Sequence, residues 1–226
     1  MFEAVFQNPS EFRIKVREGG WRNPTPYQCP GYVQANLVVL PKEYAFDFMG
    51  FCHRNPKPCP LIEVLEPGET EAKISAPRSD IRTDLPKYRV FQKGKTYLRD
   101  DVKDLWRDDL VTFLLGCSFT FDSVLLNAGI PVRHIGEGKN VSMYITNRRC
   151  NPFGVFRGPL IVSMRPIPSH LIPLAVELSG DFPIAHGSPV HVGNPLSLGI
   201  KDLKKPDFGD PVTIEGDEIP VFWACG

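Results

Sequence analysis

No segment of this 226-residue chain is apolar for long enough to cross a membrane. A transmembrane helix needs roughly 18–20 consecutive apolar residues, and no run in the chain approaches that length. Residues 1–20 carry charges throughout and lack the apolar stretch of a secretory signal. We therefore expect a cytoplasmic protein that has no membrane partner.

The chain also lacks net charge and has no basic cluster. Lys and Arg together number 26, and so do Asp and Glu. Proteins that bind DNA or RNA use clustered Lys and Arg to neutralise phosphates. The balance of charge therefore argues against a nucleic-acid partner and against an anionic membrane surface.

The six cysteines are not spaced as a metal or redox motif. No two of them form the Cys-x-x-Cys pair that a zinc ribbon or a thioredoxin-like site needs. Three disulfides are the alternative, but 226 residues with 42% apolar side chains can build an ordinary core without cross-links. We expect reduced thiols that are mostly buried.

Three motifs of nucleotide or acyl chemistry are absent. Gly94-Lys95-Thr96 resembles the end of a phosphate-binding loop, but Arg89 stands where that loop needs its first glycine. Gly136-x-Gly138 has Val141 in place of the third glycine of a dinucleotide fingerprint. No Gly-x-Ser-x-Gly sequence is present. The chemistry that we expect therefore needs neither ATP nor NAD.

Proline and glycine, by contrast, are plentiful. The chain has 23 prolines, about twice the usual share, and 19 glycines, interleaved with apolar runs. This pattern predicts an irregular, loop-rich mixed α/β (α+β) enzyme. It could form a single unit or two α/β sub-domains, and with two sub-domains we expect the site between them. We expect residues 12–226 to form one module, which residues 1–11 precede as a polar lead-in.

Hydrophobic patterning predicts short helices and strands without strict βαβ alternation. The clearest helix is expected over 101–115, where apolar residues recur at helical spacing. The other helices are expected at 41–54, 120–128 and 168–178. Strands are expected at 34–40, 61–65, 88–91, 141–146, 160–164, 190–192, 212–214 and 220–223.

The first candidate site segment is Gly116–Asp122, where a helix break places a thiol and hydroxyls at a helix N-terminus. Free amides there favour an anion and would lower the pKa of the Cys117 thiol. The alternative is that Cys117 is a core residue and that Ser118 or Thr120 caps the helix.

A second segment, Gly158–Pro166, ends a buried strand with Arg165. A guanidinium binds a carboxylate through two parallel hydrogen bonds, so Arg165 could hold a substrate, or it could form an internal ion pair. The last strand, 220–226, carries a further thiol at Cys225.

A third segment carries His186 and His191. Their spacing points the two rings to opposite sides of a regular strand, which disfavours a two-histidine metal site. We expect one of them to be a general acid or base that titrates between about pH 5.5 and 8.

From Gly31 to Gly226 the chain resembles the D-glutamate cyclase family, whose members are also called hydro-lyases. The resemblance is dense, because many specific blocks occur in order. They are Pro30-Gly31-Tyr32-Val33-Gln34-Ala35-Asn36, Arg54-Asn55-Pro56-Lys57-Pro58-Cys59-Pro60, Leu105-Trp106-Arg107-Asp108-Asp109, Gly116-Cys117-Ser118-Phe119-Thr120-Phe121, Ile130-Pro131-Val132-Arg133-His134, Ser163-Met164-Arg165-Pro166, His186-Gly187 with Pro189-Val190-His191, and Phe222-Trp223-Ala224-Cys225-Gly226.

The resemblance implies a carbon–oxygen lyase of amino-acid metabolism that dehydrates D-glutamate to 5-oxo-D-proline. By chemical fit we assign substrate binding to five residues of the matching blocks and proton transfer or polarisation to five others. The substrate-binding residues are Arg165, Arg133, Thr120, Asn36 and Tyr32. The catalytic residues are His186, His191, Cys117, Ser118 and Asp122.

The sequence departs from the family at two points. Asp122 stands where the family usually has glutamate. Family members also continue past the final Cys-Gly into a histidine-containing tail, whereas this sequence ends there, so the resemblance implies that residues beyond Gly226 could help to close the site.

Two other functions remain open: a hydro-lyase acting on another small acid, and a non-catalytic sensor of small carboxylates. In each case the partner is a small-molecule carboxylate. No metal ligands and no cofactor are predicted, although a divalent cation and a homo-oligomer remain open.

Overall fold

A computed structural model describes residues 6–225 of the chain. Its helices are α1 (Pro9–Arg17), α2 (Lys42–Arg54), α3 (Phe119–Asn127), α4 (Arg133–Gly136) and α5 (Ile172–Gly180), with short 3-10 turns η1 (Lys103–Leu105), η2 (Ser169–Leu171), η3 (Pro183–Ala185) and η4 (Pro195–Leu198). Its strands are β1 (Ala35–Pro41), β2 (Leu61–Val64), β3 (Tyr88–Gln92), β4 (Lys95–Arg99), β5 (Leu110–Gly116), β6 (Ser142–Arg149), β7 (Pro159–Pro168), β8 (His191–Val192) and β9 (Glu218–Cys225).

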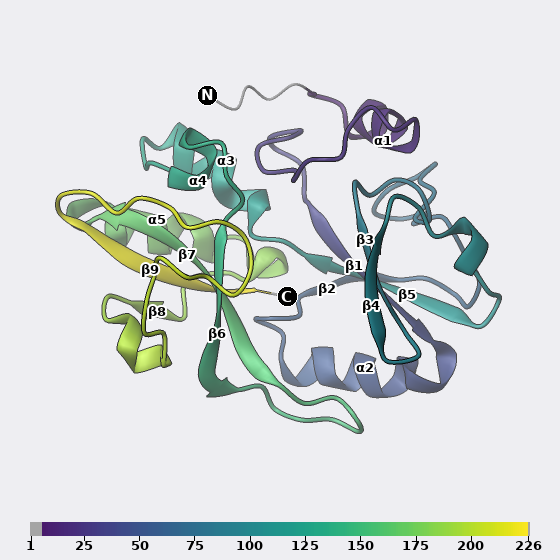
Figure 1. Ribbon diagram of the computed structural model, residues 1–226. Helices are drawn as coiled ribbons and strands as arrows, with labels where there is room; N and C mark the ends of the chain where they lie inside the picture. The colour runs from purple at the N-terminus through teal and green to yellow at the C-terminus, as the bar shows by residue number, and fades with distance from the viewer. Residues whose placement is uncertain (1–5, 226) are drawn as a thin grey trace.

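The strands form two main antiparallel sheets and one hairpin. The first sheet has the order β1-β5-β2, and β3 pairs only with β4. The second has the order β6-β7-β9-β8. The two sheets occupy opposite sides of the molecule, and β9 runs toward the middle, between them (Figure 1). The mixed α/β class is therefore confirmed.

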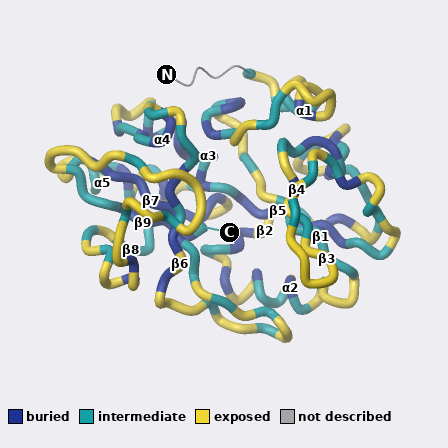
Figure 2. The backbone as a smooth tube through the Cα atoms, in the orientation of Figure 1, coloured by how far each residue is buried: buried dark blue, intermediate teal, exposed yellow. Residues whose placement is uncertain are grey.

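The second sheet is covered on both faces. Alternate residues of a strand point to opposite faces, so Val221 and Trp223 of β9 join α3, α4 and α5 in one core cluster. Phe222 lies on the other face with Tyr144, Met164 and the η4 turn. These strands and α3 form a dark, buried interior under exposed loops (Figure 2).

In the first sheet, α2 packs on one face. Phe48 and Cys52 of this helix contact Phe113 and Leu115 of β5 in a cluster of apolar side chains. Leu114 points to the opposite face and packs with residues of the loop after β2. Strand β5 is thus buried on both faces.

The helix expected at 101–115 is wrong, because residues 110–116 form β5. Every residue from 110 to 116 pairs with β1, and β2 pairs on the other side. The strand expected at 212–214 does not form, because the Thr213 amide donates to the Glu137 carboxylate instead of a strand. The remaining expected strands and the helices at 41–54, 120–128 and 168–178 are confirmed within a few residues.

Two helices and one strand were not expected from the sequence: α1, α4 and β4. Asn8 caps the N-terminus of helix α1, because its side chain accepts a hydrogen bond from the Ser10 amide. At the other end, Arg17 forms a bidentate ion pair with Asp84. Within residues 6–225, no helix is long and apolar enough to cross a membrane.

Candidate functional site

The molecule has two halves, one built on the first sheet and one on the second. The turn from β5 into α3 lies where these halves meet. The Gly116 amide donates to the Pro60 carbonyl at 2.9 Å, and the Cys117 amide donates to the Gln34 carbonyl at 3.0 Å. A Cβ atom on Gly116 would lie 1.6 Å from the Ile184 carbonyl oxygen. Only glycine therefore allows η3 to approach the end of β5.

Arg165 lies beside this turn and is fully buried. Its Nε donates to Asp122 Oδ1 at 2.7 Å, Nη2 to Ser118 Oγ at 3.1 Å, and Nη1 to Ser163 Oγ at 3.3 Å. The guanidinium also lies over the rings of Phe121 and Trp223, at 5.1 and 5.4 Å.

The surroundings of Arg165 are those of the internal ion pair that the sequence left open. Each guanidinium nitrogen already has a partner, and the Asp122 carboxylate has no exposed surface either. Such a pair is costly to break, because either charge alone would be buried without compensation. A direct contact between Arg165 and a substrate stays a prediction.

His134 adds an imidazole to this pair. Its Nε2 lies 3.2 Å from Asp122 Oδ2, but the contact does not have the alignment of a good hydrogen bond. Burial and the Arg165 charge lower the pKa of His134 and outweigh the opposing effect of Asp122. For Asp122, burial would raise the pKa, but the charge of Arg165, with a further effect from the neighbouring His134 ring, holds it below its usual value. The pair is therefore ionised beside a neutral imidazole at neutral pH.

The thiols near Arg165 are protonated. Burial raises the pKa of Cys117 to about 11 and that of Cys225 to about 12, although the Arg165 charge opposes both changes. The expectation of a lowered Cys117 pKa is therefore wrong, although the Phe119 amide acts in the expected direction. The Phe119 amide and the Asn36 side chain both act on the Cys117 sulfur in the direction of a lower pKa, but the loss of hydration outweighs them.

The hydroxyls of the same segment are already engaged. Ser118 Oγ accepts from Arg165, and Thr120 Oγ1 accepts from the Gln34 amide at 3.0 Å. The amides of Thr120 and Phe121 donate to the carbonyls of Cys117 and Ser118 in tight turns. Polarisation of a substrate by these groups stays a prediction.

His186 is held at the junction of the two halves. It follows η3 with a left-handed backbone (φ 80°) and is 1% exposed. Its Nδ1 lies 2.7 Å from the Lys57 carbonyl oxygen, which can only accept a hydrogen bond, so Nδ1 carries the proton. In the neutral ring Nε2 then has a free lone pair. Burial lowers the pKa of His186 to about 4, and the Arg165 charge adds to this effect.

His191, in contrast, lies apart from the group around Arg165. Its ring packs against Phe222, on the face of the second sheet opposite Trp223 and Arg165. Its Nε2 lies 2.8 Å from the Asn194 carbonyl oxygen and so carries a proton. The structure thus separates the two histidines of this segment.

The remaining predicted residues lie outside the group around Arg165, and Arg133 lines a different cavity from Asn36 and Tyr32. Arg133 forms ion pairs with Glu215 (3.3 Å) and Glu218. Asn36 is exposed, and its side chain contacts the Cys117 thiol. Tyr32 is 54% exposed. Of these three residues, only Asn36 contacts a member of the group around Arg165, namely Cys117.

A cavity of about 940 Å³ opens next to this group. Asn36 and Tyr32 line it from the first half, and Phe119, Asn140 and Ile184 from the second. The β3–β4 hairpin contributes Arg89, whose guanidinium lies 5.9 Å from the centre of the Phe208 ring. Asn36, which contacts the Cys117 thiol, connects this cavity to the group around Arg165, whereas Cys117, Arg165 and His186 are not among its lining residues.

Sequence reasoning missed three polar residues of the group: His134, Ser163 and Lys57. All three belong to blocks that carry the family resemblance, so that signal could have found them. Residues 6–225 contain no group of three or more His, Cys, Asp or Glu side chains that could hold a metal ion.

Known proteins resemble this chain over nearly its whole length. The family model described as D-glutamate cyclase matches residues 111–226. The chain belongs to the D-glutamate cyclase family. The relative "Putative hydro-lyase GK2103" of Geobacillus kaustophilus is 57% identical over 224 residues, covering 99% of this chain and 85% of its own. A Thermoanaerobacter relative with the printed name "Putative hydro-lyase Teth514_1597" is 56% identical over 219 residues, covering 96% and 83%.

Among solved structures, the nitrogen repressor-like protein MJ0159 of Methanococcus jannaschii aligns with 98% of this chain and 85% of its own. The TM-score is 0.39 and the identity 10%, so this alignment supports no argument about fold or function. The D-glutamate cyclase family and its named relatives support a hydro-lyase.

Proposed function

We propose that this member of the D-glutamate cyclase family is a carbon–oxygen lyase that converts D-glutamate into 5-oxo-D-proline and water. The family model and the names of the relatives support the general class of hydro-lyase. The specific substrate rests on the family description and on the chemistry of the group around Arg165 and His186.

The reaction needs no external proton and no cofactor to balance. The substrate ammonium loses two protons and becomes an amide N–H, while its nitrogen forms a bond to the side-chain carboxyl carbon. One carbon–oxygen bond of that carboxylate breaks, and the departing oxygen takes two protons and leaves as water. Substrate and product carry the same net charge. A single group that accepts and returns protons can serve both ends of the transfer.

His186 is the observation that carries this proposal. Its tautomer is fixed by the Lys57 carbonyl, so Nε2 faces its surroundings as an acceptor, with no hydrogen-bond partner found among the described residues. The low pKa keeps the ring neutral at pH 7. A substrate carboxylate close to the ring would favour its protonated form and bring its pKa nearer to the working pH. His186 is thus the residue that we propose for proton transfer.

Cyclisation is intramolecular, so much of its acceleration can come from holding the substrate folded. In this proposal Arg165 contributes mainly by fixing the Ser118 end of α3 and by its field, and Cys117 by its position. No covalent intermediate is needed, because the attacking amine belongs to the substrate. The Cys117 thiol, whose pKa is about 11, is a weak nucleophile at neutral pH.

The test is to incubate the protein with D-glutamate and with L-glutamate, with and without a divalent cation, and to follow 5-oxoproline by mass spectrometry. We expect product from the D enantiomer. Absence of product from D-glutamate under all conditions, with folded protein, would refute the substrate.

A hydro-lyase acting on another small acid is the second candidate. It is favoured by the names of the relatives, which state only the general class. A panel of amino and hydroxy acids, assayed for release of water as unsaturated or cyclic product, separates this candidate from the first. Binding of a carboxylate without turnover of any panel member would instead indicate a sensor.

A further inference from the structure

Lys57 is a half-buried cation for which no acidic partner is found within residues 6–225. Its ammonium has one hydrogen-bond acceptor, the Ser188 carbonyl oxygen at 2.5 Å. Burial lowers the pKa of Lys57, and no neighbouring charge offsets this effect. A half-buried ammonium that retains donor capacity favours an anionic ligand.

The position of this ammonium is fixed by its loop. Pro56, Pro58 and Pro60 restrict the backbone on both sides of Lys57. The loop is also tied to the second half of the chain, because the Asn55 side chain donates to the Asn151 carbonyl and accepts from the Asn151 amide, each at 2.8 Å. The ammonium is therefore preorganised, and binding a ligand would order little more of the chain.

Lys57 also contacts the residue that we propose for proton transfer. The carbonyl of Lys57 holds Nδ1 of His186, and its ammonium donates two residues further along, to Ser188. An anion held by the Lys57 ammonium would therefore lie beside the segment 186–188, which carries His186.

The other cations considered for this role are already neutralised. Arg165 is paired with Asp122, and Arg133 with Glu215 and Glu218. A carboxylate anion is a poor electrophile unless a positive charge compensates it. Lys57 can supply that charge without first breaking an internal ion pair.

We propose that Lys57 binds the side-chain carboxylate of a small dicarboxylic amino acid next to His186 and neutralises it for attack by the substrate amine. This inference rests on the proposed function for the identity of the substrate, but the binding role can be tested with unreactive analogues. No role for Lys57 follows from the name of the family or from those of the relatives.

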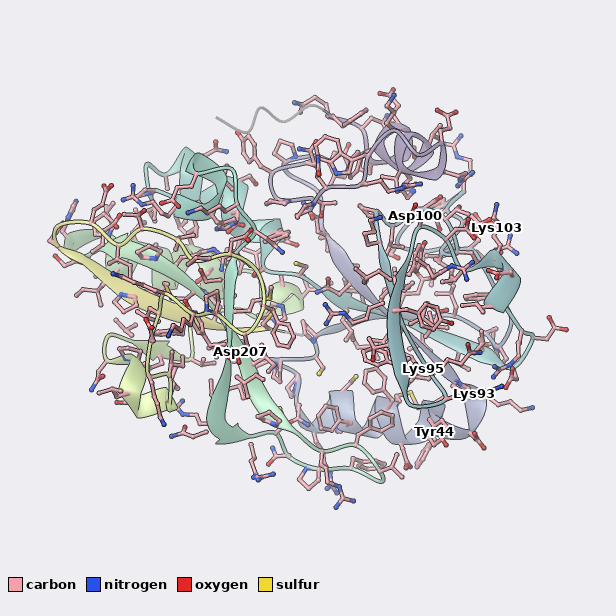
Figure 3. The ribbon with its side chains drawn as sticks, in the orientation of Figure 1. Tyr44, Lys93, Lys95, Asp100, Lys103 and Asp207 are labelled. Atoms are coloured by element: carbon pink, nitrogen blue, oxygen red, sulfur yellow. The ribbon has the colours of Figure 1, made fainter. Side chains whose placement is uncertain are left out.

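The test uses glutarate, which has two carboxylates and no amine, and its uncharged diamide, glutaramide, which has the same carbon chain. Binding of both is measured by calorimetry to the wild-type protein, Lys57→Met, Lys57→Arg and Lys103→Met. Lys103 is a matched control, because it is exposed, forms no ion pair within the described part of the chain, and lies at the outer edge of the molecule (Figure 3).

A hydrogen bond to a charged group contributes roughly 1.5–3 kcal/mol, which corresponds to about 10- to 100-fold in affinity. We expect Lys57→Met to weaken glutarate binding by that factor and to reduce the preference for glutarate over glutaramide. Lys57→Arg should retain affinity within about fivefold, and Lys103→Met should match the wild type.

A purely structural role for Lys57 would weaken the binding of glutarate and glutaramide equally. An unchanged ratio of the two affinities in folded Lys57→Met would therefore overturn the proposal, and so would failure of the wild-type protein to bind glutarate. If the ratio changes as expected but no 5-oxoproline forms from D-glutamate, the binding role stands and the proposed reaction fails.

Discussion

Replacing Asp122 by Asn tests how much the buried ion pair stabilises the fold. The substitution keeps the shape of the side chain and removes its charge. Arg165 would then be a cation with no exposed surface and no counter-ion. Removing one partner of a buried pair costs about 3–5 kcal/mol of unfolding free energy. The Ser118 and Ser163 hydroxyls would remain as acceptors, but they carry no charge.

For a chain of this length, 1 kcal/mol lowers the melting temperature by roughly 2–4 °C. We therefore expect Asp122→Asn to melt about 6–20 °C below the wild type at pH 7, as measured by circular dichroism. Urea unfolding should show a lower midpoint with an unchanged slope. Asp104→Asn is the control, because Asp104 is 60% exposed and pairs with a partly exposed Arg99. An exposed pair contributes at most about 1 kcal/mol.

The double variant Asp122→Asn, Arg165→Met separates charge from packing. It leaves no unpaired charge and places an apolar chain between the Phe121 and Trp223 rings. We expect it to be more stable than Asp122→Asn alone, so that the two changes are strongly non-additive. A loss below about 1 kcal/mol in Asp122→Asn, or full additivity in the cycle, would refute the argument.

His186→Asn should lower turnover about 100-fold while the protein stays folded, and equal turnover in the variant would exclude His186 from proton transfer. Wild-type kcat/KM should decline as the pH falls toward about 4, which is below the pH range in which an ordinary histidine titrates. The pKa of His186 is lower in the folded state than its unfolded value of about 6.5, so the unfolded state binds more protons as the pH falls. The free energy of unfolding of the wild-type protein should therefore decrease by about 3 kcal/mol from pH 6.5 to pH 4. In urea titrations, His186→Asn should show a smaller decrease over this range. Cys117→Ser should keep at least a tenth of wild-type activity, whereas a folded but inactive variant, or a thioester trapped at Cys117 by mass spectrometry, would indicate nucleophilic catalysis. Gly116→Ala should lower both activity and melting temperature, because the added Cβ would collide with the Ile184 carbonyl oxygen. Gly136→Ala is the control and should lower neither, because no atom lies within 4 Å of its Cβ position. Equal melting temperatures of the two variants would contradict the close approach of Ile184 to Gly116.

The elements that the sequence predicts well are those with local start and stop signals. Pro41 precedes α2, and Asn55-Pro56 follows its last residue. The break at Gly116 and the stop at Gly129 bracket α3. Such signals act within a few residues, so they can be read without knowledge of the partner strands.

Strand β5 shows where local reading fails. Its run Val111-Thr112-Phe113-Leu114-Leu115 is apolar on both faces, and a strand buried on both sides cannot be distinguished from a buried helix by periodicity. The spacing of Val102, Leu105 and Trp106 extended the run into an apparent helix. Pairing with β1, some 75 residues earlier in the chain, decides the outcome, and this pairing leaves no local trace.

The site was only partly predictable for the same reason. Residue chemistry singled out Cys117, Arg165 and His186, but the contacts among distant segments decide what each can do. Asp122 is 43 residues from Arg165 in sequence, and Lys57 is 129 residues from His186. The Cys117 pKa was predicted in the wrong direction because burial, a property of the whole fold, outweighs one helix amide.

The charges at the junction of the two halves give a final argument for a dicarboxylic amino acid. Arg165 and Asp122 cancel, and His134, His186, Cys117 and Cys225 are neutral at pH 7 by the directions of their pKa shifts. Lys57 then leaves a net charge of about +1 near His186. Glutamate, with two carboxylates and one ammonium, carries about −1, and so does 5-oxoproline. Ring closure with loss of water therefore leaves the charge of the site unchanged, and the protons that His186 accepts it can return.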